Sequence, residues 1–322
     1  MGKETIYILI FFCVVALLLL GAAALVGWVC RVALKMQHNY GLYVGYALAG
    51  ITLYVCAYGC TVGFTQVRVT RVEMEFEDLP VAFDGYRIVH ITDAHLGSFK
   101  GGRRQLFARD VDTILAQRAD MIVFTGDLQN HAPSELGAFA GELARLKATD
   151  GVFAVLGNHD YGYPKTHTSP REVRKAEEAA GWTTLVNQHA VVRRGSDRIV
   201  IAGMDNDGDG KHFPRRGDMA KTLEGTSADD FIVVLEHDPT SWRRNILKNS
   251  HAQLTLSGHT HAMQFGVCGW SPSEWVYDES RGAYSEGGRR LFVSTGIGGV
   301  LPFRFGMPRE IAVVTLRRAV GD

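Results

Sequence analysis

The chain has 322 residues, of which 46% are hydrophobic, 21% are charged and 10% are aromatic, and its formal net charge is zero. These fractions exclude a largely disordered chain, and the balanced charge gives no support to a nucleic-acid-binding role. The length allows one large domain or two modest ones.

Two long uncharged segments occupy the N-terminal part of the chain, at about residues 6–29 and 41–62. Each is longer than the roughly 20 residues that a helix needs to cross the hydrocarbon core of a bilayer. A cleaved signal peptide would have a shorter apolar stretch, and no second span would need to follow it. The sequence therefore predicts two transmembrane helices.

This prediction divides the chain into a membrane anchor, residues 1–66, and a domain of ordinary soluble composition, residues 67–322. A helical hairpin places its two ends on the same side of the membrane. Positive charges are slightly more numerous at those ends (Lys3, Arg68, Arg71) than in the connecting loop (Arg31, Lys35). The excess favours a multi-pass protein of the plasma or inner membrane with a cytoplasmic domain. Cys268 is the only cysteine in the soluble part, which fits a reducing compartment.

The soluble part alternates predicted strands and helices in its first half. Apolar runs predict strands at 86–92, 121–125 and 152–156, and helical spacing predicts helices at 103–119, 134–146 and 169–180. The last helix begins with a capping box at Ser169. The second half is richer in strands, predicted at 183–187, 190–194, 198–204, 231–235, 253–256, 264–267, 291–294 and 311–316. This pattern predicts two sheets packed face to face with helices outside.

Five polar clusters directly follow predicted strands. They are Asp93-Ala94-His95, Gly126-Asp127, Gly157-Asn158-His159-Asp160, Glu236-His237-Asp238 and Gly258-His259-Thr260-His261. Ligands of open α/β sheets bind beyond the carboxyl ends of the strands, so five loops would bring these side chains together. Oxygen and nitrogen donors without thiolate suit Mn, Fe, Zn or Mg and do not suit a structural cysteine zinc site. Each cluster alone is a weak indication of a metal site, but the five clusters in this order, each after a strand, are a specific one.

In this order the five clusters resemble the motifs of the calcineurin-like metallophosphoesterases, from Tyr86 to the C-terminus. The resemblance implies an α/β fold with four layers, α/β/β/α, behind the two membrane helices. It also implies two divalent metal ions, with Mn favoured. Seven side chains would hold them: Asp93, His95 and His261 at the first metal, Asn158, His237 and His259 at the second, and Asp127 between the two.

The resemblance further implies that His159 contacts the substrate phosphate and protonates the leaving oxygen, while Asp160 orients its ring. The chemistry of these groups agrees with this assignment. Phosphate esters repel anionic nucleophiles, and two cations about 3.5–4 Å apart neutralise charge and activate water. The carboxylate of Asp127 has two oxygens with which to bridge them, and a histidine is a suitable proton donor near neutral pH.

The chain thus looks like a membrane-anchored bacterial phosphodiesterase that hydrolyses a phosphodiester or pyrophosphate. Its substrate would be a phosphorylated small molecule or a lipid-linked one, such as the UDP-diacylglucosamine that some relatives in the wider superfamily hydrolyse. A phosphoprotein or nucleotide phosphatase and a non-catalytic membrane scaffold that retains the metal site are the alternatives. The absence of charge within the spans speaks against a transporter. The sequence indicates no protein partner.

Three other features carry expectations of their own. The aromatic residues of segment 268–288 are expected either to face an acyl chain or the membrane interface, or to pack onto the fold; they are Trp270, Trp275, Tyr277 and Tyr284. Arg304 is expected to form a surface salt bridge or to approach an anionic substrate. His90, which lies within a predicted strand, is expected to be structural.

Overall fold

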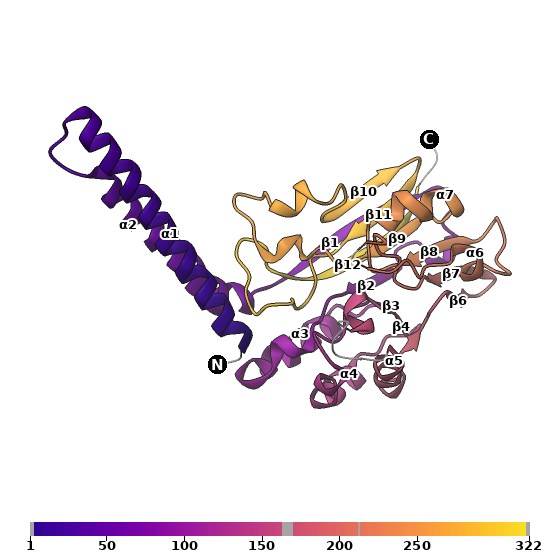
Figure 1. The fold of residues 1–322 in the computed structure, drawn as a ribbon. Helices are drawn as coiled ribbons and strands as arrows, with labels where there is room; N and C mark the ends of the chain where they lie inside the picture. Colours follow the sequence, from indigo (N-terminus) through magenta and orange to yellow (C-terminus); the bar gives the residue numbers. More distant parts are fainter. Residues whose placement is uncertain (1–2, 163–169, 212, 320–322) are drawn as a thin grey trace.

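The computed structural model describes residues 3–162, 170–211 and 213–319 (Figure 1). A hairpin of two long helices, α1 (Lys3–Leu34) and α2 (Tyr40–Tyr58), projects from an α/β domain, and α2 continues into the π-helical turn η1 (Gly59–Gly63). Both helices are long and apolar enough to cross a membrane, and only 11% of each apolar stretch is buried. Such exposure is unlike that of a core hairpin and suits surfaces that face lipid.

Two six-stranded sheets form the centre of the domain. The first has the order β1 (Val67–Phe76), β12 (Arg309–Arg318), β2 (Arg87–Ile91), β3 (Met121–Thr125), β4 (Val152–Val155) and β5 (Thr183–Thr184). The second has the order β10 (Gly282–Glu286), β11 (Arg289–Val293), β9 (Leu254–Ser257), β8 (Phe231–Leu235), β7 (Asp197–Gly203) and β6 (Gln188–Arg194). Strands β2, β3 and β4 are parallel, as are β7, β8 and β9, so the carboxyl ends within each set lie at one edge.

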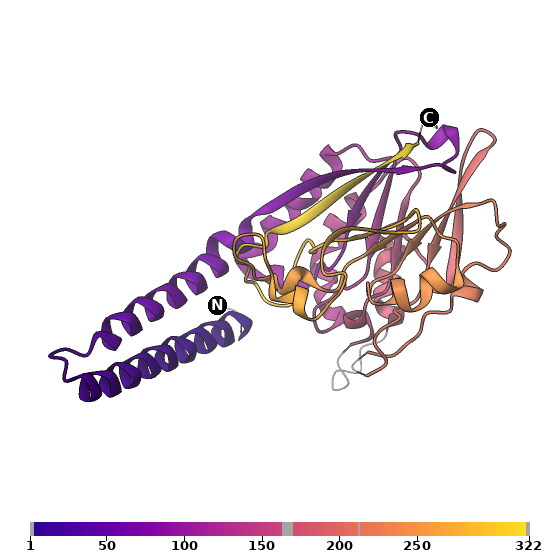
Figure 2. The same cartoon turned by 90° about the horizontal axis from the view of Figure 1, so that it is seen from above.

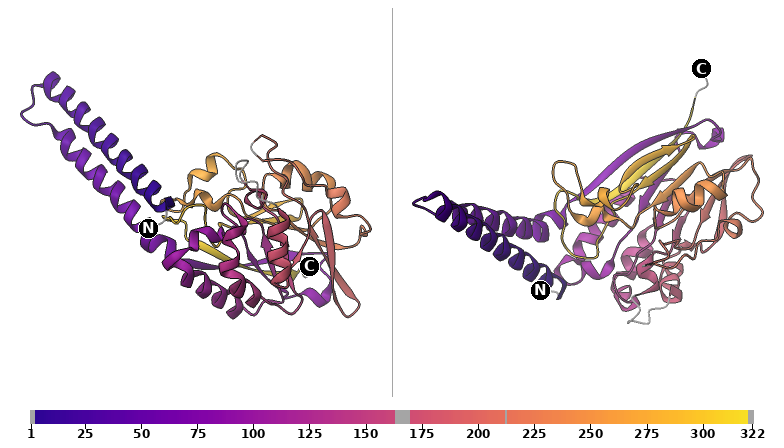
Figure 3. Two further views of the ribbon diagram at one scale, coloured as in Figure 1. Left: turned by 60° about the horizontal axis from the view of Figure 1, so that its bottom comes forward. Right: turned by 45° about the horizontal axis from the view of Figure 1, so that its top comes forward.

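Helices cover the outer faces of both sheets, which confirms the expected four layers (Figures 2 and 3). Helices α3 (Arg104–Ala116), α4 (Ala140–Arg145) and α5 (Pro170–Ala179) pack on the first sheet. The short elements α6 (Met219–Thr222), η8 (Trp242–Ile246) and α7 (Leu247–Asn249) pack on the second. A cluster of buried apolar side chains between the sheets joins their inner faces.

The central strands are apolar on both faces because both faces are covered. In β2, Ile88 packs between the sheets and Val89 packs beneath the helices. Neighbouring β3 repeats the arrangement with Val123 between the sheets and Ile122 beneath the helices. This double burial produces the uninterrupted apolar runs from which these strands were predicted.

Two predicted elements are wrong in detail. The helix expected at 134–146 is divided into η5 (Pro133–Glu135), η6 (Gly137–Phe139) and the short α4, in a stretch that contains helix-breaking proline and glycine residues. The strand expected at 264–267 does not form. Gln264 ends the turn η9 (His261–Gln264), whose φ angles of 48–55° are incompatible with an extended strand, and Phe265 and Val267 take part only in isolated bridges. The predicted cap Ser169 lies outside the described residues.

The hairpin contacts the domain through a strap, residues 301–305, that lies against the domain end of α1 and α2. The ring of Phe303 packs 5.3 Å from that of Phe12 in α1, measured between centroids. The backbone N–H of Arg304 donates to the carbonyl oxygen of Gly59 at 3.0 Å. The two helices are therefore joined to the domain by packing as well as by chain connectivity.

Candidate metal centre

The seven side chains expected to bind metal lie together at the carboxyl ends of five strands. They follow β2 (Asp93, His95), β3 (Asp127), β4 (Asn158), β8 (His237) and β9 (His259, His261). Six are buried, and His259 is partly exposed. Loops separated by as many as 168 positions in the sequence therefore form one polar cluster between the two sheets.

The first group of donor atoms surrounds one point. The Nε2 atoms of His95 and His261 lie 3.0 Å apart. The Nε2 atom of His261 lies 3.2 Å from Oδ1 of Asp93, and that of His95 lies 3.5 Å from Oδ2 of Asp127. Three of these residues also form a group whose donor atoms all lie within 4.8 Å of one another: Asp93, His95 and His261.

The second group lies on the other side of Asp127. The Oδ1 atom of Asn158 lies 3.1 Å from Nε2 of His237 and 2.8 Å from Nδ1 of His259. The Nε2 atom of His237 lies 3.3 Å from Oδ2 of Asp127, the same oxygen that faces His95. This carboxylate therefore lies between the two groups, where it could bridge two cations.

The donor set fits divalent cations. The buried Oδ1 atom of Asp93 has no hydrogen-bond partner among the described residues, and a buried carboxylate oxygen without compensation is costly. Burial lowers the pKa of both His95 and His261, so their imidazoles are neutral and can offer a lone pair. A cation at each group would satisfy the orphaned oxygen and use these lone pairs.

Backbone carbonyl groups orient two of the rings. The Nδ1 atom of His237 lies 2.7 Å from the carbonyl oxygen of Thr125, and Nδ1 of His159 lies 2.7 Å from that of Asn130. Because a carbonyl only accepts, Nδ1 carries the proton in both rings. The Nε2 atom of His237 is thereby left as the donor to a cation.

Asp160 has a different environment from the expected one. Its carboxylate accepts hydrogen bonds from the backbone N–H groups of Asp127 at 2.8 Å and Gly157 at 2.9 Å, and from two further N–H groups that follow Asp127. It therefore ties together the turns that carry Asp127 and Asn158. The ring of His159 is oriented by the Asn130 carbonyl instead, a backbone partner that side-chain motifs do not reveal.

The backbone at the cluster is strained. Five of the seven side chains belong to residues with positive φ: Asp93 (55°), His95 (41°), Asp127 (61°), His259 (71°) and His261 (51°). Residues other than glycine adopt this region at a cost, and such strain concentrates at functional sites. Gly258 permits a close approach of the backbone, since a Cβ atom there would lie 2.2 Å from Oδ2 of Asp93.

Arg304 is completely buried, so both the expected surface salt bridge and the expected substrate contact are wrong. Its guanidinium donates to the carbonyl oxygens of Thr295 at 2.6 Å and Gly298 at 2.7 Å, and its Nη2 atom lies 3.5 Å from Nδ1 of His261. Burial lowers the pKa of Arg304 to about 9, which leaves it protonated at neutral pH. It stabilises the loop behind His261. His90 is buried within β2, as expected.

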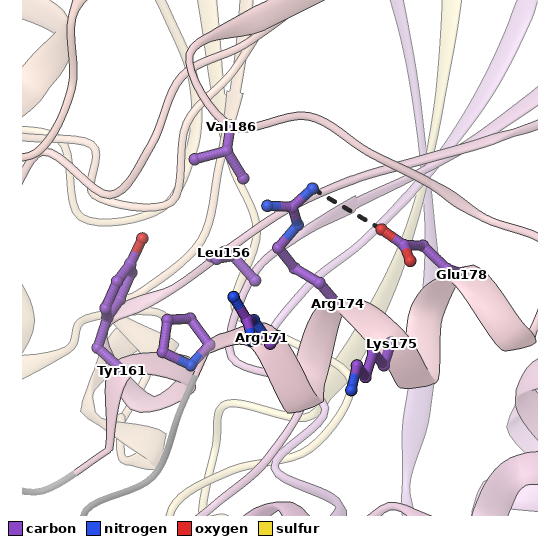
Figure 4. A pocket seen from close by; sticks show the side chains of 8 residues that line it. Leu156, Tyr161, Arg171, Arg174, Lys175, Glu178 and Val186 are labelled. Atoms are coloured by element: carbon purple, nitrogen blue, oxygen red, sulfur yellow. Dashed lines mark ion pairs between the residues drawn. The ribbon is translucent and has the colours of Figure 1, made fainter.

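A basic pocket of about 450 Å³ lies beside the turn that carries His159 (Figure 4). It is lined by Leu156, Tyr161, Pro170, Arg171, Arg174, Lys175, Glu178 and Val186. Arg174 forms an ion pair with Glu178 at 3.7 Å, and Lys175 lines the pocket beside them. The ammonium group of Lys175 suits an anionic group. The predicted site residues did not include this pocket.

Comparisons with known proteins agree with this geometry. The model of the calcineurin-like phosphoesterase family matches residues 86–263. A transmembrane protein with metallophosphoesterase domain from Danio rerio is 32% identical over 220 residues, which cover 66% of this chain and about half, 49%, of that protein. An uncharacterized metallophosphoesterase from Aquifex aeolicus is 30% identical over 256 residues, which cover 78% of this chain and 92% of that protein.

These matches extend the observations in two ways. The two apolar helices and the transmembrane relative together indicate membrane association. The family uses divalent metals, and the matched region contains both groups of donor atoms described above. The chain therefore belongs to the calcineurin-like phosphoesterase family and is a phosphoester hydrolase.

Proposed function

We propose that the protein hydrolyses a phosphodiester or pyrophosphate of a membrane-associated or lipid-linked substrate, by means of two divalent ions. The observation that carries this proposal is the position of the Asp127 carboxylate, whose Oδ2 atom lies 3.5 Å from Nε2 of His95 and 3.3 Å from Nε2 of His237. One oxygen that faces both imidazole groups suits a bridge between two ions. Asp93, His95 and His261 would hold the first ion, and Asn158, His237 and His259 the second.

The two ions, when bound, would supply Lewis acidity and an activated water for attack at phosphorus. The chain's own groups complete the site. Asn158 adds a neutral oxygen ligand and so limits negative charge near an anionic substrate. His159, with its Nδ1 atom fixed by Asn130, would in its doubly protonated form present Nε2–H to the leaving oxygen, donate that proton and become the neutral Nδ1–H imidazole. Asp160 would hold the turns of Asp127 and Asn158 at the required separation.

The substrate class is inferred from two features of the molecule. The hairpin would keep the site close to a bilayer and raise the effective concentration of a lipid-linked substrate. The basic pocket suits a second anionic group, such as the remote phosphate of a pyrophosphate. UDP-diacylglucosamine combines a pyrophosphate with a lipid and is the example we propose to test.

We further propose that residues 1–66 are an anchor that crosses the membrane twice, and that residues 67–322 are a catalytic domain on the cytoplasmic side. Strand β1 begins at Val67, directly after the hairpin, which supports this boundary. Protease treatment of sealed inside-out and right-side-out vesicles tests the orientation. The domain is expected to be cleaved only in inside-out vesicles, and cleavage only in right-side-out vesicles would reverse the assignment.

The chemistry is tested with the full chain in detergent, Mn, and bis-p-nitrophenyl phosphate. We expect hydrolysis that a chelator abolishes and added Mn restores, and a loss of both activity and bound metal in Asp127→Asn. The matched control is Asp112→Asn, because Asp112 is an exposed carboxylate of α3 that pairs with Arg145. Activity that survives both chelation and Asp127→Asn would refute the two-metal mechanism. Equal rates on soluble and micellar lipid-linked diesters would refute the lipid-linked substrate.

A further inference from the structure

We propose that an exposed apolar surface beside the metal centre docks into the interface of the bilayer that the hairpin crosses. This docking surface consists of Met263, Val267, Trp270, Trp275, Val276 and Leu301, which are between 36% and 79% exposed. Contiguous exposed apolar patches usually mark interaction sites, and tryptophan is enriched where proteins meet the headgroup region of a membrane.

The docking surface is held in a defined conformation. The backbone of Val267 and Trp270 exchanges two hydrogen bonds, of 2.9 and 3.0 Å, across a tight turn. The rings of Trp270 and Trp275 pack with their centroids 4.7 Å apart. The Oγ atom of Ser271 donates to the carbonyl oxygen of Ala262 at 2.6 Å. These side chains are therefore exposed although the segment that carries them is ordered. The expectation that the aromatic residues pack onto the fold does not describe Trp275, which is 79% exposed.

The docking surface is continuous with the base of the hairpin. The amide of Gln264 donates to the carbonyl oxygen of Leu301 at 2.8 Å, which joins the segment to the strap. Phe265 stacks on Phe305 of the strap, and Phe305 contacts Tyr58 of α2, with centroid distances of 5.7 and 5.6 Å. In Figures 1 and 2 the orange segment between β9 and β10 lies at the end of the domain from which the hairpin projects.

The depth of the hairpin contact places the strap near the membrane surface. Helix α1 has 32 residues, or about 48 Å at 1.5 Å per residue, whereas the hydrocarbon core is about 30 Å thick. Each end of a centred helix would therefore extend about 9 Å beyond the core. Phe12, which contacts Phe303, lies about 13 Å from the start of the helix, near the boundary of the core. The apolar side chains around the strap would then meet lipid.

A bilayer fits the docking surface better than a protein partner does. All six side chains are uncharged and apolar, and the surface extends directly from the helices that are expected to contact lipid. Of the charged side chains at its border, Glu274 and Arg281 already pair with each other at 2.9 Å, so they are partly neutralised. This inference depends on insertion of the hairpin and does not depend on the proposed hydrolysis.

Docking would bring the metal centre to the membrane surface. The segment starts at Met263, two residues after His261, and it continues to Tyr277, whose hydroxyl lies 3.5 Å from Nε2 of His259. One end of the segment is therefore close in sequence to His261, and its other end contacts His259. Both histidines lie in the loop after β9. A lipid headgroup beside the docking surface would therefore lie next to the metal centre.

The experiment uses the full chain in vesicles of phosphatidylethanolamine and phosphatidylglycerol, with bromine at a shallow acyl-chain position. Bromine quenches the fluorescence of nearby tryptophan. In a Trp28→Phe background we expect a quenched component that Trp270→Phe/Trp275→Phe removes, because Trp182 and Trp242 are buried in the domain. The difference in quenched fluorescence between the wild type and the Trp270→Phe/Trp275→Phe protein gives the same measurement without the change at Trp28.

The control is Val191→Trp, which places an exposed indole on β6, and we expect no quenching of its added emission. Docking is refuted if brominated lipid quenches Trp28 of α1 in the wild type but leaves the emission of Trp270 and Trp275 unchanged, because the hairpin would then be inserted without docking. A dimer that dissociates in Trp275→Ser, without lipid quenching, would instead assign the surface to a second copy. Hydrolysis of a soluble diester by the same vesicles separately reports on the proposed function.

Discussion

The ring of His159 is fixed at one nitrogen by the backbone. Its Nδ1 atom lies 2.7 Å from the carbonyl oxygen of Asn130, so Nδ1 keeps its proton and Nε2 is the atom that can exchange one with a substrate. Asp127 also accepts a hydrogen bond from the backbone N–H of His159 at 2.7 Å. The position of this proposed proton donor is therefore coupled directly to the carboxylate between the two groups of donor atoms.

This geometry predicts that the effect of His159→Ala depends on the leaving group. An alkoxide needs a proton to leave, so kcat for an alkyl phosphodiester should fall by about 10²–10⁴-fold. A p-nitrophenolate leaves readily without a proton, so the loss for bis-p-nitrophenyl phosphate should be much smaller. Steady-state kinetics on both esters, with metal analysis of the variant, measures the difference. Equal losses on the two esters, or loss of bound metal, would contradict the assigned role.

A second residue-scale prediction concerns His90, which is buried in β2. Burial lowers the pKa of His90 to about 3, whereas the unfolded value is about 6.5. Between these values the unfolded chain binds a proton that the folded chain does not. The stabilising contribution is therefore fully present above pH 6.5 and is lost as the pH falls, by up to about 1.4 kcal/mol per pH unit.

His90→Gln should reduce the pH dependence of the free energy of unfolding by about one proton between pH 6.5 and 4. Glutamine can keep the hydrogen bond that His90 makes to Thr125 at 2.8 Å, but it does not titrate. Urea denaturation of both proteins at several pH values in detergent measures the slopes. Identical slopes would show that His90 does not titrate in this window.

At the scale of elements, α5 supplies the positive charge of the basic pocket. Replacement of both Arg174 and Lys175 by glutamine should raise KM for a substrate with a second phosphate and leave kcat unchanged. Two partly exposed ion pairs of about 0.2–1 kcal/mol each correspond to a rise of up to about 30-fold. Substrates with one phosphate should be unaffected, and Arg193→Gln, an exposed charge change on β6, is the control. An equal rise in KM for both substrate classes would contradict the prediction.

Burial explains which elements the sequence could predict. Strands β2, β3, β4 and β8 are covered on both faces, so their residues form apolar runs that stand out. Strands β1 and β10 lie at sheet edges and alternate in exposure, so they contain no such run and were not predicted. Residues 264–267 were expected to form a strand, but Gln264 has a left-handed backbone, and Phe265 and Val267 form only isolated bridges.

The same distinction applies to the site. The clustering of the candidate metal ligands could be predicted because cations require particular donor types, and those donors follow recognisable strands. Asn130 and Arg304 could not, because one acts through a carbonyl oxygen and the other through hydrogen bonds to the backbone of a distant loop. Such contacts depend on tertiary structure and require no particular neighbours in the sequence.

At the scale of the whole molecule, the hairpin and the metal centre share one contact region. A Cβ atom on Gly63, at the end of η1, would lie 1.7 Å from the carbonyl oxygen of Arg304, whose side chain supports His261. Gly63→Ala should therefore displace the strap, destabilise the protein by about 1–3 kcal/mol, and lower its metal content. Thermal unfolding in detergent and metal analysis measure both effects.

Gly50→Ala is the matched control for this prediction. Gly50 lies within α2, and a Cβ atom there would meet nothing within 4 Å. Alanine is favoured over glycine inside a helix by about 1 kcal/mol, so this variant should be as stable as the wild type or slightly more stable. If both variants behaved alike, the junction at Gly63 would not transmit strain to the metal centre.

The position of β12 in the first sheet has a consequence for biosynthesis. This strand, Arg309–Arg318, lies between β1 and β2, which are both much earlier in the chain. While the ribosome is still translating, the hairpin can already enter the bilayer, but β1 has no neighbour with which to pair until residues near 318 have left the exit tunnel. The first sheet is therefore completed only after β12 has left the exit tunnel, and loading of metal should follow that step.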